Sequence, residues 1–379
     1  MKKMVFTAVM AAMIGAVSCG ESNPQPTEGS RIGFALSFFR NVNKSVSPDE
    51  NILVSPYSAG AALSMLAEGA EGETRVELDN ALNGTLYKDE RLSGGDDAVV
   101  ESSNSLWISD NFSIRNSYVS LLQKDYDAFT DVLDFSDPSS SKVINNWCSE
   151  HTSGKITEIV DRLSPGTVMI LINALYFNAP WENAFNPEMT HEVLFHGISS
   201  ETKVPMMARK AMYNYGEYQG AKMIEIPYAG GRYAMYVVLP PEGMNLDSFI
   251  PYVGEKEFEM AISMLSPKEV ALTMPKLKLE TSLLLNRTLE NMGVRTAFSG
   301  AADFTGISVS GPLAVDLVKQ KCYIDVSEKG TEAAAVTSVQ VRMTSVRPSL
   351  SMNIDRPFVF MIADMNTKDI LFAGKIVNL

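Results

Sequence analysis

The stretch that decides the fold of this chain is 328–341, with the sequence EKGTEAAAVTSVQV. From Thr331 onward the residues alternate as in a β-strand, in which successive side chains point to opposite faces. One face would carry Thr331, Ala333, Ala335, Thr337, Val339 and Val341, and the other Glu332, Ala334, Val336, Ser338, Gln340 and Arg342. Pro348 and a polar run follow at once, which is typical of a loop. The pattern therefore predicts two states, first a loop and then a strand that enters the protein's own sheet.

The beginning of this stretch has the composition of a hinge. A loop that must enter a sheet cannot bury large charged side chains, because the unpaired burial of a charge is costly. Glycine tolerates large changes of backbone dihedral angles, and small residues ease the first steps of entry. The hinge would consist of Glu328, Gly330, Thr331, Glu332, Ala333, Ala334 and Ala335. Taken alone, these residues fit a polar, alanine-rich surface loop equally well.

Short motifs along the rest of the chain point to one protein family. They lie at 51–58, 62–65, 69–74, 173–177, 181–185, 204–207, 226–228, 275–278, 302–308, 355–360 and 371–378. In this order they make residues 30–379 resemble a serpin, a family of serine protease inhibitors. The resemblance implies an α+β fold with N-terminal helices, large mixed β-sheets and an exposed reactive-centre loop at about 328–350.

The hydrophobic pattern predicts the same fold class. Helical spacing is found at 32–42, from the cap Ser55 and the first-turn residue Pro56 to 67, at 74–82, and at 278–292 before Gly293. Apolar runs predict strands at 104–108, 170–177, 233–239 and 270–274, and a terminal hairpin at 358–363 and 370–377. Helices come first and strands dominate later, which favours α+β over a doubly wound sheet.

Composition limits the organisation and the partners of the chain. Its 379 residues are 45% hydrophobic and no linker-like segment interrupts 30–379, so we expect one domain there. The formal net charge is −13, which repels phosphate backbones and excludes nucleic acid as an expected partner. We expect a monomer.

The first residues are predicted to be a targeting segment and not part of the fold. Lys2 and Lys3 precede a short apolar run, so 1–18 is interpreted as a signal peptide. Cys19 follows as in a bacterial lipoprotein, with 19–29 as a lipid-anchored tether, although Ala16 stands where Leu is usual. We therefore expect an outer-membrane lipoprotein of a bacterial cell envelope, periplasmic or surface-facing. The alternative is an ordinary signal peptide and a secreted protein, if Cys19 is not lipidated.

The sequence gives little support for an enzyme. His191 and His196 are five residues apart, whereas a zinc-protease helix needs its two histidines four apart on one face. We interpret them as surface histidines at a strand end. There is no Gly-x-Ser-x-Gly elbow, phosphate-binding glycine loop or Cys-x-x-Cys pair, so no catalytic residue, metal or cofactor is predicted. Cys148 and Cys322 are expected to be buried free thiols.

The resemblance implies where the inserting strand would enter. Ser55, Ser58 and Asn173 match the family's polar cluster under the central sheet, and Trp181 matches the tryptophan where the loop first enters. Gln320 stands where the family usually has a histidine, and a carboxamide cannot titrate. Trp181 is equally well an ordinary core aromatic.

The resemblance also implies the function, a suicide inhibitor of serine proteases, with cysteine proteases as an additional target class. Counting from Gly330 predicts the scissile bond at Thr344–Ser345, counting back from Arg356 predicts Met343–Thr344, and Arg342–Met343 is a third option. Met343 or Thr344 suits elastase- or subtilisin-like targets, and Arg342 suits trypsin-like ones. The alternative is a non-inhibitory binding or structural protein of the same fold.

Overall fold

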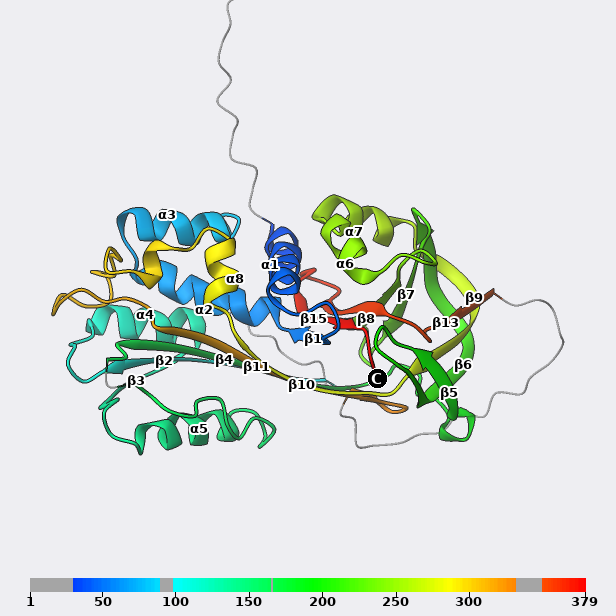
Figure 1. Ribbon diagram of the computed structural model, residues 1–379, viewed down its shortest axis with the longest axis horizontal. Coiled ribbons are helices and arrows are strands. Elements are labelled where there is room, and N and C mark those ends of the chain that lie inside the picture. Colours follow the sequence, from blue (N-terminus) through cyan, green and yellow to red (C-terminus); the bar gives the residue numbers. More distant parts are fainter. Residues whose placement is uncertain (1–29, 89–97, 165, 332–349) are drawn as a thin grey trace, which may run out of the picture.

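The computed structural model describes residues 30–88, 98–164, 166–331 and 350–379. Within them the chain forms two β-sheets with helices packed around both (Figure 1). The helices are α1 (Arg31–Ser45), α2 (Pro56–Gly69), α3 (Gly72–Ala81), α4 (Asn116–Tyr126), α5 (Ser140–Glu150), α6 (Leu246–Phe249), α7 (Glu255–Ser263) and α8 (Asn286–Asn291). Short 3-10 turns are η1 (Pro187–Met189), η2 (Ile250–Tyr252) and η3 (Thr296–Phe298).

Six strands form the first sheet, in the spatial order β10-β11-β12-β4-β2-β3. Their bounds are β2 (Val99–Ser109), β3 (Phe129–Leu133), β4 (Met169–Pro180), β10 (Leu277–Leu284), β11 (Leu317–Ser327) and β12 (Gly330–Thr331). The second sheet has the order β1-β15-β14-β8-β7-β6-β9-β13, with β5 added to β6. Its strands are β1 (Ile52–Val54), β5 (His191–His196), β6 (Glu201–Tyr218), β7 (Ala221–Pro227), β8 (Tyr233–Leu239), β9 (Ser266–Pro275), β13 (Leu350–Asn353), β14 (Phe358–Asp364) and β15 (Ile370–Ile376).

The six-stranded sheet lies between two helical layers, with α5 on one face and α2 and α4 on the other (Figure 1). Successive side chains of β4 point to opposite faces of the sheet, so alternate residues pack against the two helical layers. Ile170 and Ile172 pack in a small cluster with Trp147 of α5, whereas Leu171 and Leu175 pack in the main core. Because both faces are covered, β4 reads in sequence as a continuous apolar run.

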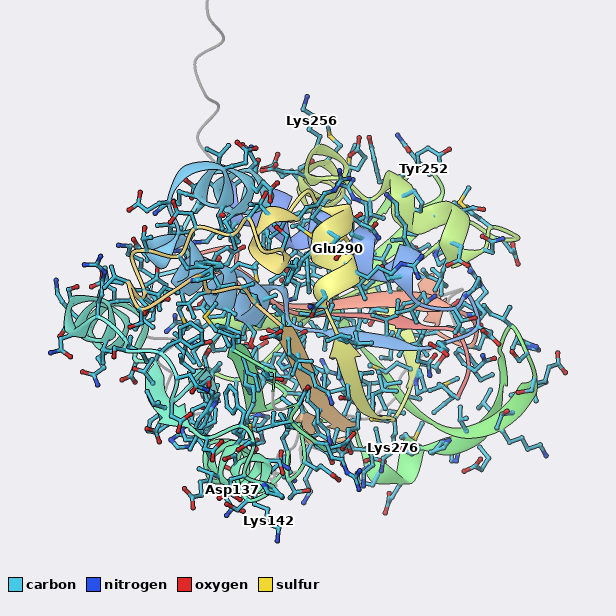
Figure 2. All side chains as sticks on the ribbon, turned by 60° about the vertical axis from the view of Figure 1, so that its left-hand side comes forward. Asp137, Lys142, Tyr252, Lys256, Lys276 and Glu290 are labelled. Atoms are coloured by element: carbon cyan, nitrogen blue, oxygen red, sulfur yellow. The ribbon has the colours of Figure 1, made fainter. Side chains whose placement is uncertain are left out.

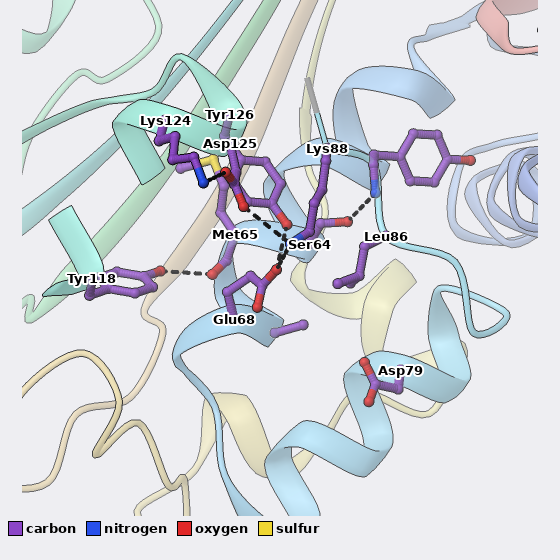
Figure 3. A network of polar contacts seen from close by, with 12 residues as sticks. Ser64, Met65, Glu68, Asp79, Leu86, Lys88, Tyr118, Lys124, Asp125 and Tyr126 are labelled. Atoms are coloured by element: carbon purple, nitrogen blue, oxygen red, sulfur yellow. Dashed lines mark hydrogen bonds and ion pairs between the residues drawn. The ribbon is translucent and has the colours of Figure 1, made fainter. Parts of the chain in front are cut away.

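Local signals in the sequence explain helix α2. The Ser55 hydroxyl accepts a hydrogen bond from the Ser58 backbone N–H at 3.2 Å, and Pro56 occupies the first turn, as predicted. A polar network then fastens α2 to α4 (Figure 3). The Lys88 ammonium lies 2.8 Å from a Glu68 carboxylate oxygen and 3.2 Å from that of Asp125, and the Tyr118 hydroxyl donates to the Met65 carbonyl at 2.8 Å.

One predicted helix is wrong over half its length. The segment 278–292 was expected to be helical, but Leu277–Leu284 is strand β10 and only Asn286–Asn291 is helix α8. The strand pairs with β11 from Leu277 opposite Val326 to Leu284 opposite Lys319. Its burial alternates along its whole length, which is the period-two pattern of a strand. The expected stop at Gly293 is correct, since its φ of +102° cannot continue a helix.

The other predictions of secondary structure agree with the structure. Strand β8 covers the predicted 233–239, and β14 and β15 form the predicted terminal hairpin. His191 and His196 lie at the two ends of β5, both exposed, so the strand reading is confirmed. Cys148 and Cys322 are buried free thiols, and burial raises the pKa of Cys148 to about 12. None of the helices within the described residues is long and apolar enough to cross a membrane.

Candidate functional site

The candidate site is the junction of β4 and β11, which we call the seam. The two strands are parallel and pair directly from Leu317 opposite Ile170 to Cys322 opposite Leu175. Above this point they part, and the two-residue strand β12 lies between them. Gly330 is opposite Ser327 and Pro180, and Thr331 is opposite Val326 and Ala179. Gly330 and Thr331, the described end of the predicted hinge, therefore lie in the sheet, antiparallel to both neighbours.

Gly330 allows β12 to lie close to β4. Its φ is +148°, in a region that side chains with a Cβ rarely adopt. A Cβ added here would lie 2.3 Å from the Ala179 carbonyl oxygen and 2.5 Å from the Pro180 Cα. Both obstacles are backbone atoms of β4, so they cannot move aside as a flexible side chain would. Only glycine lets the hinge approach β4 this closely.

Thr331 ends the described part of the hinge in a buried aromatic environment. Its side chain is fully buried, and its hydroxyl is hydrogen-bonded to the Tyr228 hydroxyl at 2.7 Å. The Tyr228 ring stacks on Trp181 with centroids 4.4 Å apart. The Trp181 indole N–H donates to the Ser327 carbonyl at 2.9 Å, and its backbone N–H donates to Lys329 at 2.9 Å. Trp181 thus holds the turn between β11 and β12 through two hydrogen bonds.

Glu328 fastens the same turn from the other side. Its carboxylate lies 3.0 Å from the Lys276 ammonium and accepts a 2.9 Å hydrogen bond from the Thr190 hydroxyl. Its carbonyl accepts from the Phe185 backbone N–H at 2.8 Å. Burial acts to raise the pKa of Glu328, but hydrogen bonds from its own backbone N–H, from Lys276 and from Thr190 outweigh burial and hold that pKa below its usual value.

A polar cluster lies halfway down the seam, under the N-terminus of α2. The carboxamide of buried Gln320 accepts from the Ser55 backbone N–H and donates to the Ser55 carbonyl, both at 2.9 Å. Asn173 faces Gln320 across the seam, but its amide donates to Asn104 of β2. Among the described residues no hydrogen bond joins the Gln320 and Asn173 side chains. Each side of the seam is therefore fastened to its own neighbours.

The structure brings together the predicted residues that it describes. Ser55, Ser58, Asn173 and Gln320 form the polar cluster, and Trp181 lies with Glu328, Gly330 and Thr331 at the top of the seam. The predicted residues Glu332, Ala333, Ala334, Ala335, Arg342, Met343, Thr344, Ser345 and Cys19 lie outside the described residues.

Several contacts were not predicted. Tyr228 and Lys276 lie within the family-like motifs at 226–228 and 275–278, but nothing in the sequence indicated that they contact the hinge. No sequence motif pointed to Asn104 or Thr190. Only the long-range contacts of the folded chain identify these partners.

Comparisons with known proteins agree with this geometry. The family description "Serpin (serine protease inhibitor)" matches residues 30–379. A serpin-like protein of Methanosarcina mazei is 36% identical over 365 residues, covering 90% of this chain and 85% of that protein. The native state of the thermophilic serpin tengpin superposes with a TM-score of 0.86 at 30% identity, covering 92% of this chain and 93% of tengpin. Human thyroxine-binding globulin, solved with thyroxine, has a TM-score of 0.84 at 28% identity over 92% and 97% of the two chains.

This chain therefore belongs to the serpin family and has the serpin fold. The α+β prediction is confirmed. The family is described by serine protease inhibition, which agrees with the general class of function expected from the sequence.

Proposed function

We propose that this protein is a suicide inhibitor of serine proteases, which traps the acyl-enzyme by inserting its cleaved reactive loop into the seam. The observation that carries the proposal is the register of β12. Thr331 already pairs with Val326 of β11 and with Ala179 of β4. Continuing an antiparallel strand in the same register assigns a partner on each side to every following residue.

This extended register agrees with the alternation of the loop sequence. On the β11 side, Ala333, Ala335, Thr337 and Val339 would face Ile324, Cys322, Gln320 and Val318, all buried. The uncharged, mostly small face of the loop therefore meets the core-facing side of β11. Glu332 would face half-buried Asp325 on the other side of the sheet, where a charge can reach solvent. A loop that stays on the surface would not require its small, uncharged residues to coincide with the buried positions of β11.

The same register predicts what happens in the polar cluster. Thr337 would lie opposite Gln320 on β11 and opposite Asn173 on β4. Thr337 would then lie between the side-chain amides of Gln320 and Asn173. Its hydroxyl can both donate and accept a hydrogen bond, so it suits this polar position better than an apolar side chain would. The strand would run out of partners at Gln340, opposite Leu317 at the start of β11.

The distance over which the cleaved loop would insert explains how the protease is trapped. The target's serine attacks a loop carbonyl, the peptide bond breaks, the new amine leaves, and an ester joins the loop to the protease. Leu350 is held by β9, so the cut frees the upstream segment from that anchor. Insertion of residues 332–340 beside β11 then carries the ester roughly 30 Å, at about 3.3 Å per residue. Distortions near 1 Å already slow an active site ~100-fold, so this displacement would stop deacylation.

We place the scissile bond at Thr344–Ser345, with Met343–Thr344 and Arg342–Met343 as alternatives. Elastase- and subtilisin-like proteases are the proposed targets, and trypsin-like enzymes could use Arg342. We further propose a monomer held by a lipid on Cys19 at a bacterial outer membrane, or secreted if that cysteine is not modified. These residues all lie outside the described part of the chain.

The test is to incubate the protein with trypsin, pancreatic elastase and subtilisin and to analyse the products by denaturing electrophoresis. We expect a band resistant to SDS near the summed masses, and a released C-terminal fragment that begins at Ser345 with elastase by mass spectrometry. Cleavage of the loop without such a band for every protease tested would favour a non-inhibitory binding protein. If no fragment begins between Met343 and Val346, the predicted position of the scissile bond is wrong.

A further inference from the structure

A second concave site lies far from the hinge along the chain, where α6, η2 and α7 cover the β6–β7 hairpin of the nine-stranded sheet. It encloses about 750 Å³ of free space, including the part open to solvent. Its lining consists of Gly216, Tyr218, Gln219, Ala221, Met223, Val238, Pro241, Met244, Phe249, Tyr252, Val253, Glu257, Phe258 and Ala261. Among the described residues of the hinge and seam, none belongs to this lining.

The walls of this pocket are apolar and aromatic. Of the apolar residues that line it, Met223 and Phe258 are buried, and Phe249 and Val238 are half-buried. At the mouth, large apolar side chains remain in water: Tyr252 is 73% exposed and Met244 is 41% exposed. Tyr252 lies at the outer edge of the molecule (Figure 2). Small-molecule sites commonly have such apolar walls with a few polar groups at fixed positions.

One carboxylate lines this pocket, and a cation lies behind it: a Cβ added at Gly254 would be 2.5 Å from a Glu257 carboxylate oxygen and 3.6 Å from an Arg40 guanidinium nitrogen. Among the described residues that line it, Glu257 is the one with a charged side chain. No hydrogen bond or ion pair of the Glu257 carboxylate occurs within the described residues. Lys256, the neighbour in sequence, points away from the body of the molecule (Figure 2) and does not line the pocket. The rings of Tyr218 and Tyr252 add faces that attract cations.

We propose that this pocket binds a small aromatic molecule that carries a cationic amine. The ring would lie against Met223, Phe249 and Phe258, and the ammonium group would lie at the mouth beside Glu257. This orientation buries the apolar part of the ligand and keeps its ammonium group near solvent, beside the exposed Glu257 carboxylate.

Three probes with one ring system test the proposal: tryptamine, indole and indole-3-acetate, titrated into the protein by calorimetry. We expect tryptamine to bind more tightly than indole, and indole-3-acetate to bind most weakly. Replacing Glu257 by Gln should lower tryptamine affinity about tenfold and leave indole unchanged. Glu259→Gln, on the same helix but outside the pocket lining, is the matched control and should change neither. Ala261→Phe, which fills the pocket, should abolish binding of all three.

Two results would overturn the proposal. One is that no probe binds the protein, or that binding persists in a folded Ala261→Phe variant. The other is that the Glu257→Gln variant still prefers tryptamine over indole. That result would show that the Glu257 carboxylate does not contact the ammonium group. Because calorimetry of these probes needs no protease, failure here leaves the inhibitor proposal standing, and failure of inhibition leaves this one standing.

Discussion

The side chain of Gln320 pairs with the backbone of Ser55 in both directions, through two hydrogen bonds of 2.9 Å. The amide of β11 is thereby committed to the cap of α2 and is not shared with Asn173, its neighbour across the seam. Parting β11 from β4 therefore breaks backbone pairs and no side-chain bond between these two residues.

The first prediction concerns pH. A carboxamide does not titrate, so entry at Gln320 should not depend on its protonation. A Gln320→His variant should gain such a dependence, because histidine titrates near pH ~6.5. The measurement is the ratio of variant to native inhibition rates at several pH values, which cancels the protease's own profile. We expect this ratio to change several-fold across the titration and to stay flat for Gln320→Asn. A flat ratio for the histidine variant would contradict the role of this position.

The second prediction concerns Gly330. Gly330→Ala should push β12 out of the seam, because the added Cβ would lie 2.3 Å from the Ala179 carbonyl oxygen. The indole of Trp181 should then lose its contacts with the turn, which changes its fluorescence. Gly166→Ala is the control, since a Cβ there meets nothing within 4 Å. Unchanged fluorescence, together with unchanged protection of the hinge from proteolysis, would argue against a close approach.

The third prediction concerns Thr331. Thr331→Arg places a guanidinium in a fully buried position, so insertion should fail while the loop remains cleavable. The variant should become a substrate, seen as turnover without complex in a titration of inhibitor against protease. Thr331→Val keeps the shape and loses the hydrogen bond to Tyr228, about 1 kcal/mol, and should still inhibit. Glu332→Ala, on the opposite face, should also still inhibit. Full inhibition by the arginine variant would rule out insertion.

The fourth prediction uses the lowered pKa of Glu328. A carboxylate whose pKa is depressed in the folded protein stabilises it above the ordinary value of 4.5 and ceases to do so as pH falls through the lower folded value. The contact with Lys276 should therefore loosen only below about pH 4.5, and hydrogen exchange of residues 327–331 should rise there. Glu328→Gln should show the faster exchange already at neutral pH and lose the acid transition. An identical acid transition in both proteins would assign it to another group.

The fifth prediction concerns location. Cys19→Ser should move the protein from the membrane fraction to the soluble fraction of the producing bacterium, because a lipid-modified cysteine is the proposed anchor. Metabolic labelling with a fatty acid should mark the native protein and not the variant. Ser18→Ala, which keeps Cys19, is the matched control and should remain in the membrane fraction. Equal retention of both proteins in the membrane fraction would refute the anchor.

The sequence alone determined the elements whose signals are local. Ser55 and Pro56 predict the start of α2 because a cap and a first-turn proline act within a few residues. The alternation after Thr331 predicts a strand because the pleat has a period of two, and this prediction falls outside the described residues. The fold class followed from such signals and from the order of the motifs.

Tertiary structure decided what depends on distant partners. Leu277–Leu284 is a strand because β11 supplies its hydrogen bonds, although the run before Gly293 resembled a helix. Gln320 pairs with Ser55 although 265 positions separate them. Gly330 and Thr331 occupy the seam only because β4 and β11 part at their upper ends and leave backbone groups to be paired. Each outcome depends on contacts that exist only after distant segments have met.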